Sequence, residues 1–339
     1  MNVDPAATGG ADFTADGVFS GGGIKGLAFA GALAGAEEAG YRQWHELAGT
    51  SAGAITAMAL AVGYDAEALK RSLDGFQFSR IADYGFPIHL LGAVKDLIFH
   101  ESIVEGDELT RWIRSLLDES PPKAVHADST FGELAALAPA RTLVVVGADI
   151  AHSRAVVFPR DVALYQDKQG EPLDPNAFPL FKAVRISAGY PYFFPPVGGL
   201  WDRSTKKEGV FVDGGVASSF PLFLFDKPVP QHPTWGFHLH GGFDPRENQP
   251  SHRDIGGLTW PKEMLEGILD TATNALDKFE LQRFESRVIP IPTGEVSTLN
   301  FNLSDSEKAY LYESGLKAAR AFFATAPKPE NSYGKVPAP

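Results

Sequence analysis

The sequence contains no cysteine. Disulfides, thiolate nucleophiles and cysteine-ligated metal sites are therefore excluded from its chemistry. It also has no run of 18 apolar residues, so we expect no membrane-spanning helix. The first residues, MNVDPAATGGADFTADG, lack a basic region followed by an apolar stretch and do not form a secretory signal. These absences predict a cytoplasmic location.

Basic residues are scarce, with 30 Lys and Arg against 42 Asp and Glu and a formal net charge of −12. No basic patch is visible, so nucleic acid is not an expected partner. The 339 residues are 44% hydrophobic, which is ample for a large core. No internal repeat or break in composition marks a boundary. We therefore expect one domain over residues 15–325, with disordered tails at 1–14 and 326–339.

The pentapeptide Gly49-Thr50-Ser51-Ala52-Gly53 has the pattern G-x-S-x-G. It lies between an apolar stretch and a small-residue helix expected over residues 52–61, which is the context of a nucleophile elbow. Gly49 and Gly53 avoid Cβ clashes with the neighbouring strand and helix, and the helix N-terminus favours negative charge beside Ser51. The pattern also arises by chance in a chain with 35 glycines, so alone it leaves open a plain corner residue.

A second glycine-rich corner, Gly21-Gly22-Gly23-Ile24-Lys25-Gly26, follows a strand expected over residues 16–20 and precedes a helix expected over 27–39. The backbone N–H groups of such a loop converge on an anion. The same residues fit the dinucleotide pattern G-x-G-x-x-G, with Glu46 at a suitable distance to bind a ribose. Residues 41–45 (YRQWH), however, make a poor second strand for a nucleotide-binding fold. A dinucleotide-binding oxidoreductase is the alternative from a different class.

A third corner, Asp213-Gly214-Gly215, ends a strand expected over residues 210–212. Strands alternate with helices along the chain, which predicts an α/β fold with a largely parallel sheet covered on both faces. Further expected strands lie at 141–149, 154–158, 235–240 and 288–291, and further helices at 64–80, 106–118, 178–187, 263–283 and 304–324. Ligands bind at the carboxyl ends of such strands, where we expect all three corners to meet.

Two other features allow more than one interpretation. His238 and His240 could supply a triad base in the order Ser…Asp…His, or an H-x-H metal pair, although such residues are more often packed strand histidines. The apolar stretch 84–104 has helical spacing within Phe86–Phe99. It is either a core-facing helix or a mobile flap over an apolar acyl groove that contacts the membrane.

The three corners, in this order, resemble those of the patatin-like phospholipase family. Ile186–Pro196 (ISAGYPYFFPP) is similar to the family's serine/proline block, and Val212–Pro221 (VDGGVASSFP) to its aspartate block, with Ser219 where the family often has asparagine. Phe301–Phe323 resembles the terminal helix of bacterial members. The match covers about residues 16–325 and implies a three-layer α/β/α fold with a largely parallel central sheet.

The resemblance implies a lipid acyl hydrolase of the phospholipase A or lysophospholipase type. It would cleave glycerolipid acyl esters through an acyl-serine intermediate. Ser51 would be the nucleophile and Asp213 the base, in a dyad without histidine, metal or cofactor. Gly22, Gly23 and the N–H of Ala52 would form the oxyanion hole. The supporting residues would be Gly21 and Lys25, and the motif glycines Gly26, Gly49, Gly53, Gly214 and Gly215.

A carboxylate with an ordinary pKa near 4 is a weak base, so the dyad needs an apolar pocket that raises the pKa of Asp213. Tyr190, Phe193, Phe194 and Phe220 are the candidate walls. The expected partners are a phospholipid or other glycerolipid, a membrane surface contacted peripherally, and a regulatory ligand or protein of the kind that activates some bacterial relatives. A non-catalytic lipid-binding module, with Ser51 as a plain corner, stays open alongside the oxidoreductase.

Overall fold

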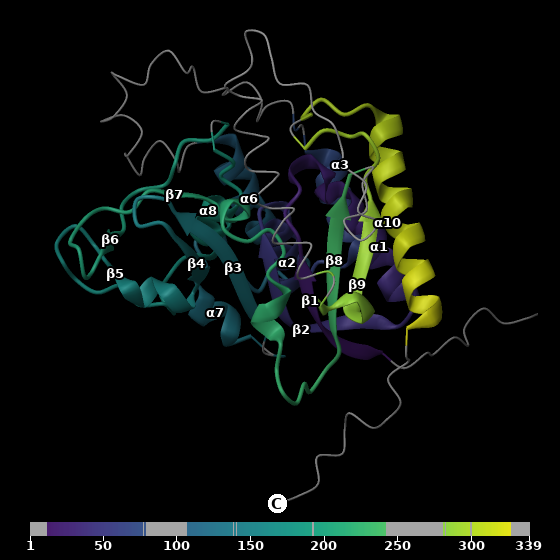
Figure 1. Cartoon of the computed structure of the whole chain (residues 1–339), viewed down its shortest axis with the longest axis horizontal. Helices are drawn as coiled ribbons and strands as arrows, with labels where there is room; N and C mark the ends of the chain where they lie inside the picture. The colour runs from purple at the N-terminus through teal and green to yellow at the C-terminus, as the bar shows by residue number, and fades with distance from the viewer. Residues whose placement is uncertain are drawn as a thin grey trace, which may run out of the picture.

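A central β-sheet runs through the molecule and positions all three glycine-rich corners (Figure 1). The computed structural model describes residues 12–76, 78, 107–137, 139, 141–191, 193–241, 281, 283–298 and 300–326. Within them the sheet has seven strands, in the order β4-β3-β2-β1-β8-β9, and β7 pairs with β3 off this path. The strands are β1 Phe13–Phe19, β2 Tyr41–Thr50, β3 Thr142–Asp149, β4 Arg154–Phe158, β7 Phe211–Asp213, β8 Thr234–His240 and β9 Val288–Pro292.

The strand directions give a mostly parallel sheet. The pairs β1–β2, β2–β3, β1–β8 and β8–β9 are parallel, whereas β4 and β7 each run antiparallel to β3. A separate two-stranded sheet joins β5 Tyr165–Gln166 to β6 Trp201–Asp202. The expected α/β class with a largely parallel sheet is confirmed.

The α-helices of the described residues gather on one face of the sheet. They are α1 Leu27–Glu38, α2 Ala52–Ala61, α3 Ala66–Gly75, α6 Glu108–Asp118, α7 Phe131–Ala135, α8 Leu180–Ser187 and α10 Asp305–Thr325. Alternate residues of one strand face opposite sides, so Phe19 packs among these helices while Val18 packs into a second cluster. In the described residues, the members of that second cluster outside the strands lie in and just before η5 Leu222–Phe225 and just before η7 Glu285–Arg287; they are Phe220, Leu222, Phe225, Leu281 and Phe284.

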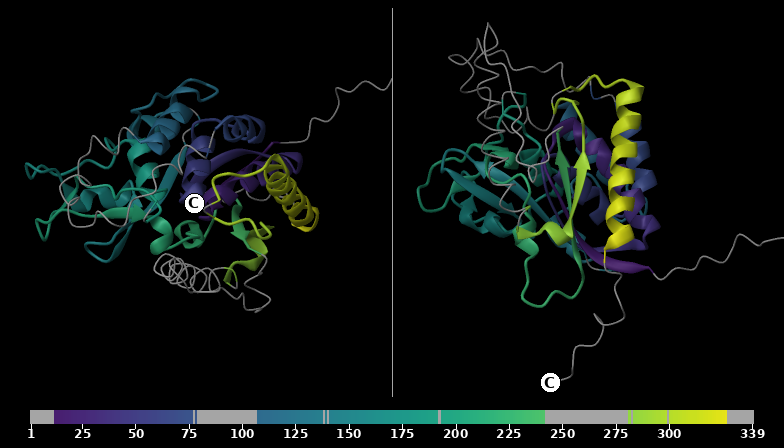
Figure 2. Two further views of the ribbon diagram at one scale, coloured as in Figure 1. Left: turned by 90° about the horizontal axis from the view of Figure 1, so that it is seen from above. Right: turned by 45° about the vertical axis from the view of Figure 1, so that its right-hand side comes forward.

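Small residues allow α1 and α10 to pack closely (Figure 2). A Cβ on Gly31 of α1 would lie 1.9 Å from the Tyr312 carbonyl oxygen, and one on Gly315 of α10 would lie 2.0 Å from that of Ala28. The capping box of Ser304 and Glu307 begins α10 as expected. No helix of the described part is both long and apolar enough to cross a membrane.

The structure differs from the sequence-based expectation at the start of two strands. Residues 41–45, predicted to be a poor strand, are the first half of β2. Tyr41 and Trp44 are buried in the core while Arg42 and Gln43 are exposed, so aromatic packing outweighs the polar composition. β1 begins at Phe13, two residues before the expected domain boundary, because Phe13 packs on the Tyr41 ring. Residues 84–104 and most of 263–283 lie outside the described residues.

Candidate active site

The strands β2 and β7 meet end to end beside β3. β2 pairs with β3 as far as Thr50 opposite Val146, and β7 pairs with β3 from Gly147 opposite Asp213 onward. β4 pairs with one edge of β3. β2 and then β7 pair with the other edge, and β7 begins its pairing where that of β2 ends. We expected the three corners to meet because all their strands would be parallel. The Asp213 corner instead reaches Ser51 on an antiparallel strand that runs head-on towards β2.

Ser51 has a strained backbone, with φ 56° and ψ −125° at the start of α2. Such a conformation in a non-glycine residue is typical of a nucleophile elbow. The flanking glycines are required by close packing, since a Cβ on Gly49 would lie 2.2 Å from the Gly53 carbonyl oxygen. A Cβ on Gly53 would lie 2.2 Å from the Phe19 carbonyl oxygen. The corner therefore fits tightly between β1 and its own helix.

A residue that sequence reasoning did not select, Ser187 at the end of α8, holds this corner in place. Its Oγ accepts a hydrogen bond of 2.9 Å from the Ser51 N–H and donates one of 2.5 Å to the Val146 carbonyl. Ser187 thus ties the elbow to β3. The signal available in the sequence was the segment Arg185–Gly189, which resembles the elbow pentapeptide itself.

The side chains of Ser51 and Asp213 contact each other directly. Ser51 Oγ donates to Asp213 Oδ2 at 2.7 Å, and the Gly215 N–H donates to Oδ1 at 2.7 Å. Ser51 is 8% exposed and Asp213 3%. Burial raises the pKa of Asp213 to about 6, against the lowering effect of these two hydrogen bonds. The carboxylate is therefore a stronger base than an exposed aspartate.

The first glycine loop places free backbone donors near the serine. A Cβ on Gly21 would lie 3.5 Å from Ser51 Cβ, so the two corners touch. Within the described residues, the N–H groups of Gly22, Gly23 and Ala52 have no hydrogen-bond acceptor. Gly23 adopts φ +56°, and a Cβ there would lie 2.4 Å from the Thr298 carbonyl oxygen. The arrangement offers several amide donors to an anion beside Ser51.

The remaining motif residues complete these corners. The Lys25 N–H donates to the Gly22 carbonyl and closes the loop into η1 Gly23–Gly26. A Cβ on Gly26 would lie 2.8 Å from Ala52 Cβ, so α1 and α2 approach closely where they begin. A Cβ on Gly214 would lie 2.1 Å from the Val146 carbonyl oxygen. Small residues therefore permit the close approach of all three corners.

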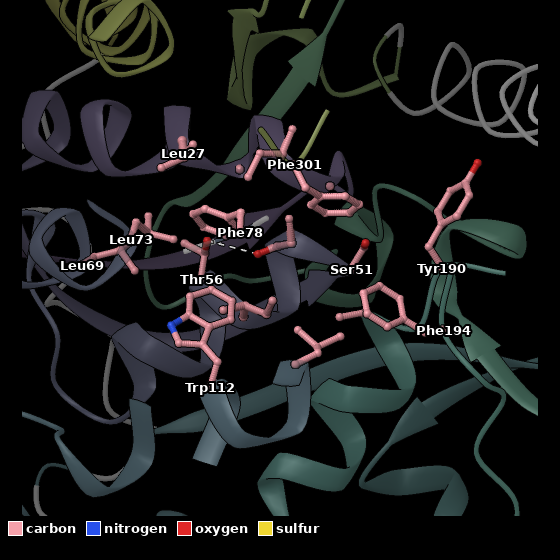
Figure 3. Close-up of a pocket in the computed structure, with 17 residues that line it drawn as sticks. Leu27, Ser51, Thr56, Leu69, Leu73, Phe78, Trp112, Tyr190, Phe194 and Phe301 are labelled. Atoms are coloured by element: carbon pink, nitrogen blue, oxygen red, sulfur yellow. Dashed lines mark hydrogen bonds between the residues drawn. The ribbon is translucent and has the colours of Figure 1, made fainter. Parts of the chain in front are cut away.

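An apolar pocket of about 690 Å³, open mouth included, lies beside Ser51 (Figure 3). Figure 3 shows the Ser51 hydroxyl between Phe301, Phe194 and Tyr190 at one end of it. The other walls are apolar side chains from α1, α2, α3, α6 and the segment that follows α3, among them Leu27, Ile55, Leu69, Leu73, Leu109, Trp112 and Phe78. The apolar lining suits a hydrocarbon chain.

Two of the four candidate walls do not line the pocket. Phe193 packs against Phe301, which does line the pocket, with 5.8 Å between the ring centroids. Phe220 belongs to the second cluster, on the opposite face of the sheet. Sequence reasoning missed Phe78, Trp112 and Phe301, because an amphipathic pattern marks a buried helix face without saying whether that face lines a cavity.

The strand histidines lie away from the dyad. His238 alternates with Phe237 and Leu239, which face the helical core, so its ring points to the other face and packs 5.2 Å from the Phe220 ring. His240 Nδ1 lies 3.0 Å from the Gly241 carbonyl oxygen. The triad interpretation therefore finds no support among the described residues.

Glu46, the candidate ribose-binding residue of the oxidoreductase alternative, lies in the middle of β2. Its carboxylate accepts a hydrogen bond from Lys227. In nucleotide-binding folds the corresponding acidic residue lies at the carboxyl end of the second strand, where the ligand binds. The position of Glu46 therefore disfavours that alternative.

The chain is similar to known proteins both in sequence and in fold. The family model Patatin-like phospholipase matches residues 17–226. The uncharacterized protein YqhO of Bacillus subtilis is 33% identical over 311 residues, which are 91% of this chain and 97% of YqhO. VipD from Legionella pneumophila has a similar fold, with a TM-score of 0.56 and 18% identity over 94% of this chain and 67% of VipD. ExoU of Pseudomonas aeruginosa, solved with SpcU, gives 0.51 at 20% identity over 93% of this chain, which spans 52% of that structure.

Proposed function

The chain belongs to the patatin-like phospholipase family, whose members act on lipids, and we propose that it hydrolyses glycerolipid acyl esters through an acyl-serine intermediate on Ser51. The observation that carries this proposal is the 2.7 Å hydrogen bond from Ser51 Oγ to the buried carboxylate of Asp213. Nucleophile and base are within direct reach, as acyl transfer requires.

In the first step, Ser51 Oγ attacks the ester carbonyl carbon while Asp213 Oδ2 takes the hydroxyl proton. The carbonyl π electrons move to its oxygen and form a tetrahedral oxyanion. With a pKa of about 6, most Asp213 side chains are ionised at neutral pH. The pKa of the base also lies nearer to the pH at which the enzyme works than that of an exposed aspartate does. Because of this raised basicity, the carboxylate can accept the Ser51 proton directly, without a histidine between them.

The oxyanion would be stabilised by the amides of Gly22, Gly23 and Ala52. These donors have no acceptor in the described residues, so they need not break an existing bond. Removing one such donor typically costs about 10²–10³ in rate. The N-terminus of α2, which begins at Ala52, adds its favourable partial charge. We propose that Gly21 and Lys25 support the loop.

The intermediate collapses when the bond from the former carbonyl carbon to the glycerol oxygen breaks. Asp213 returns its proton to that oxygen, and the alcohol leaves. Water then attacks the acyl-serine, with its proton passing to Asp213, and the fatty acid is released as Ser51 recovers its proton. The pocket between Phe194, Phe301 and Trp112 would hold the acyl chain throughout.

A non-catalytic lipid-binding module would also use this pocket. It would have no need for the strained backbone of Ser51 or for three amides that find no acceptor among the described residues, and these two features favour catalysis. The proposed substrate lies in a bilayer, so membrane contact is peripheral in this proposal. A cytoplasmic location, activation by a ligand or protein partner, and a membrane-contacting flap at Phe86–Phe99 stay predictions from the sequence.

The test is release of fatty acid from phospholipid vesicles and from a soluble short-chain ester. We expect the wild-type protein to release acid from both and Ser51→Ala to release none above background. Binding of vesicles without hydrolysis by either protein would indicate the lipid-binding module. Equal activity of the two proteins would place the reaction elsewhere. Lipid profiles of both incubations identify the head group and the ester position.

A further inference from the structure

The pairing of β1 with β2 is irregular at Asp16. Ala15 lies opposite Trp44 and Gly17 lies opposite Leu47, so the single residue Asp16 faces two residues of β2. These two residues are His45 and Glu46. A bulge of this kind turns side chains that would normally alternate towards a common point, and it is frequent at functional positions.

The bulge brings three metal-ligating groups together. Asp16 is 4% exposed, and its Oδ1 accepts a 3.0 Å hydrogen bond from the Glu46 N–H. His45 Nδ1 lies 3.6 Å from the same oxygen. One ligand atom from each of Asp16, His45 and Glu46 lies within 4.8 Å of the other two. Burial raises the pKa of Asp16, against the lowering effect of its hydrogen bond from the Glu46 N–H.

A fourth group lies across the other edge of β1. Thr234, the first residue of β8, pairs with Asp16, and paired residues of adjacent strands project to the same face. Thr234 is 2% exposed, and its Oγ1 has no hydrogen-bond partner among the described residues. A buried hydroxyl without a partner is costly, which points to a ligand that the surrounding protein does not supply.

One ammonium group and one further imidazole lie beside the cluster of Asp16, His45 and Glu46. The Lys227 ammonium donates to the Glu46 carboxylate, although its side chain is about half exposed. The His232 ring centroid lies 5.3 Å from that of His45. Lys227 and His232 both come from the segment between η5 and β8. This segment therefore brings one competing cation and one additional imidazole to the cluster.

We propose that Asp16, His45 and Glu46 bind a divalent transition-metal ion of the zinc type, with the Thr234 hydroxyl as a further oxygen ligand. Imidazole together with carboxylates is a ligand set that Zn²⁺ accepts. Three atoms no more than 4.8 Å apart can lie within about 2.8 Å of one common point. Small side-chain rotations then bring them to the roughly 2.0–2.2 Å of zinc–nitrogen and zinc–oxygen bonds.

The site is separate from the proposed catalytic centre. Asp16 alternates with Ala15, which packs in the helical core, so Asp16 faces the side of the sheet opposite the pocket. Ser51 lies beyond the carboxyl ends of β1 and β2, whereas Asp16 and Glu46 lie within these strands. The ion would fasten β2, β1 and β8 together and would displace Lys227 from Glu46. No step of ester hydrolysis passes through it.

Calorimetric titration of the full chain with Zn²⁺, after dialysis against EDTA, tests the site. We expect one equivalent to bind, and His45→Ala to weaken binding by at least 10-fold. His126→Ala is the matched control, because His126 is an exposed imidazole 4.0 Å from Glu133 outside the cluster, and it should bind as the wild type does. Lys227→Met should tighten binding, since it removes the competing charge.

A second measurement separates loss of the site from loss of the fold. Zn²⁺ should raise the melting temperature of the wild type and of His126→Ala but leave that of His45→Ala unchanged, because only a bound ligand stabilises the native state. Ser51→Ala should bind Zn²⁺ normally, so the site can be tested even if the proposed hydrolysis fails. Absence of binding to the wild type, or undiminished binding to His45→Ala, would overturn the proposal.

Discussion

Two buried aspartates, Asp213 and Asp149, lie along the same strand ladder but in different surroundings. Asp213 accepts hydrogen bonds from Ser51 and Gly215 and lies beside an apolar pocket. Asp149 accepts hydrogen bonds from the Tyr165 hydroxyl at 2.9 Å and the Val210 N–H at 3.2 Å, and its Oδ2 lies 2.7 Å from His152 Nδ1.

By residue type alone, the second site looks more like a hydrolase triad. His152 Nε2 lies 3.0 Å from Thr205 Oγ1, which completes a hydroxyl–imidazole–carboxylate series. Thr205, however, is exposed on a turn that Asp202 holds through the Thr205 N–H at 2.7 Å. Ser51 has the strained corner, the apolar pocket and the nearby amides for which the described residues supply no acceptor. The comparison teaches that reactivity follows from the surroundings of a hydroxyl rather than from the presence of histidine.

The Asp149 network has a structural role that its contacts explain. Its bond from the Val210 N–H fixes the residue before β7, and Asp149 itself pairs with Phe211 in that strand. Because Asp213 is the last residue of β7, the second aspartate helps to position the first. The following changes distinguish a reacting aspartate from a supporting one.

Ser51→Ala should give the largest effect. Loss of the nucleophile should lower kcat on a soluble ester by at least about 10⁴-fold, because only background catalysis by the remaining site persists. The double variant Ser51→Ala/Asp213→Ala should be hardly worse than the single one, since the two residues act as a unit. Steady-state kinetics at saturating ester measures this. Thr205→Ala serves as the matched hydroxyl control and should retain activity.

Asp213→Asn should lower kcat by roughly 10²–10⁴-fold, because the isosteric amide cannot accept the Ser51 proton. The same steady-state assay applies, with circular dichroism to establish that the fold is intact. An Asp213→Asn protein with near-normal turnover would refute the dyad and require another base.

Gly22→Val keeps the backbone N–H, but room for its side chain requires a shift that turns this N–H away from the oxyanion, so kcat should fall by roughly 10²–10³-fold, as for a lost donor. The new Cβ would lie 2.6 Å from Leu239 Cδ1, a side-chain end that can move, so the melting temperature should change little. Gly23→Val should also destabilise the fold, because Gly23 has a positive φ and a backbone oxygen 2.4 Å from the added Cβ. Normal turnover by Gly22→Val would contradict the proposed hole.

The raised pKa of Asp213 should be visible in the pH dependence of both kcat/KM and stability. With a folded pKa of about 6, Asp213 loses its basicity below that pH, and kcat/KM should fall tenfold per unit there. The native state then holds a proton between about pH 4 and 6 that the unfolded chain has released, so the contribution of Asp213 to stability falls as pH rises. Asp213→Asn should therefore melt higher than the wild type at pH 8. A lower melting temperature would contradict the raised pKa.

His152→Ala should have the smallest effect on catalysis. It removes the imidazole between Asp149 and Thr205 but leaves the Val210 hydrogen bond, so turnover should change by less than about threefold while stability falls by about 1–2 kcal/mol. Parallel kinetics and denaturant unfolding measure both. A loss as large as that of Ser51→Ala would reverse the roles of the two aspartates.

Much of the fold could be predicted from the sequence because its signals are local. Apolar runs marked β3 and β8, small residues marked α2, and the Ser304 capping box marked the start of α10. The direction of β7 could not be predicted, since a three-residue strand carries no directional signal.

The candidate site could be predicted in part. Its glycine corners have local steric requirements, so they were visible in the sequence. The walls contributed by Phe78 and Trp112 depend on how α3 and α6 pack, and the cluster at Asp16 depends on a bulge in strand pairing. Both are tertiary features without a local pattern.

The most direct test of the dyad is the rate and position of labelling by a fluorophosphonate, followed by peptide mapping. The wild type and His152→Ala should be labelled on Ser51 at similar rates, Asp213→Asn at least 10²-fold more slowly, and Ser51→Ala not at all. Labelling of Thr205, or labelling of Asp213→Asn at the wild-type rate, would contradict Ser51 and Asp213 as the reacting pair.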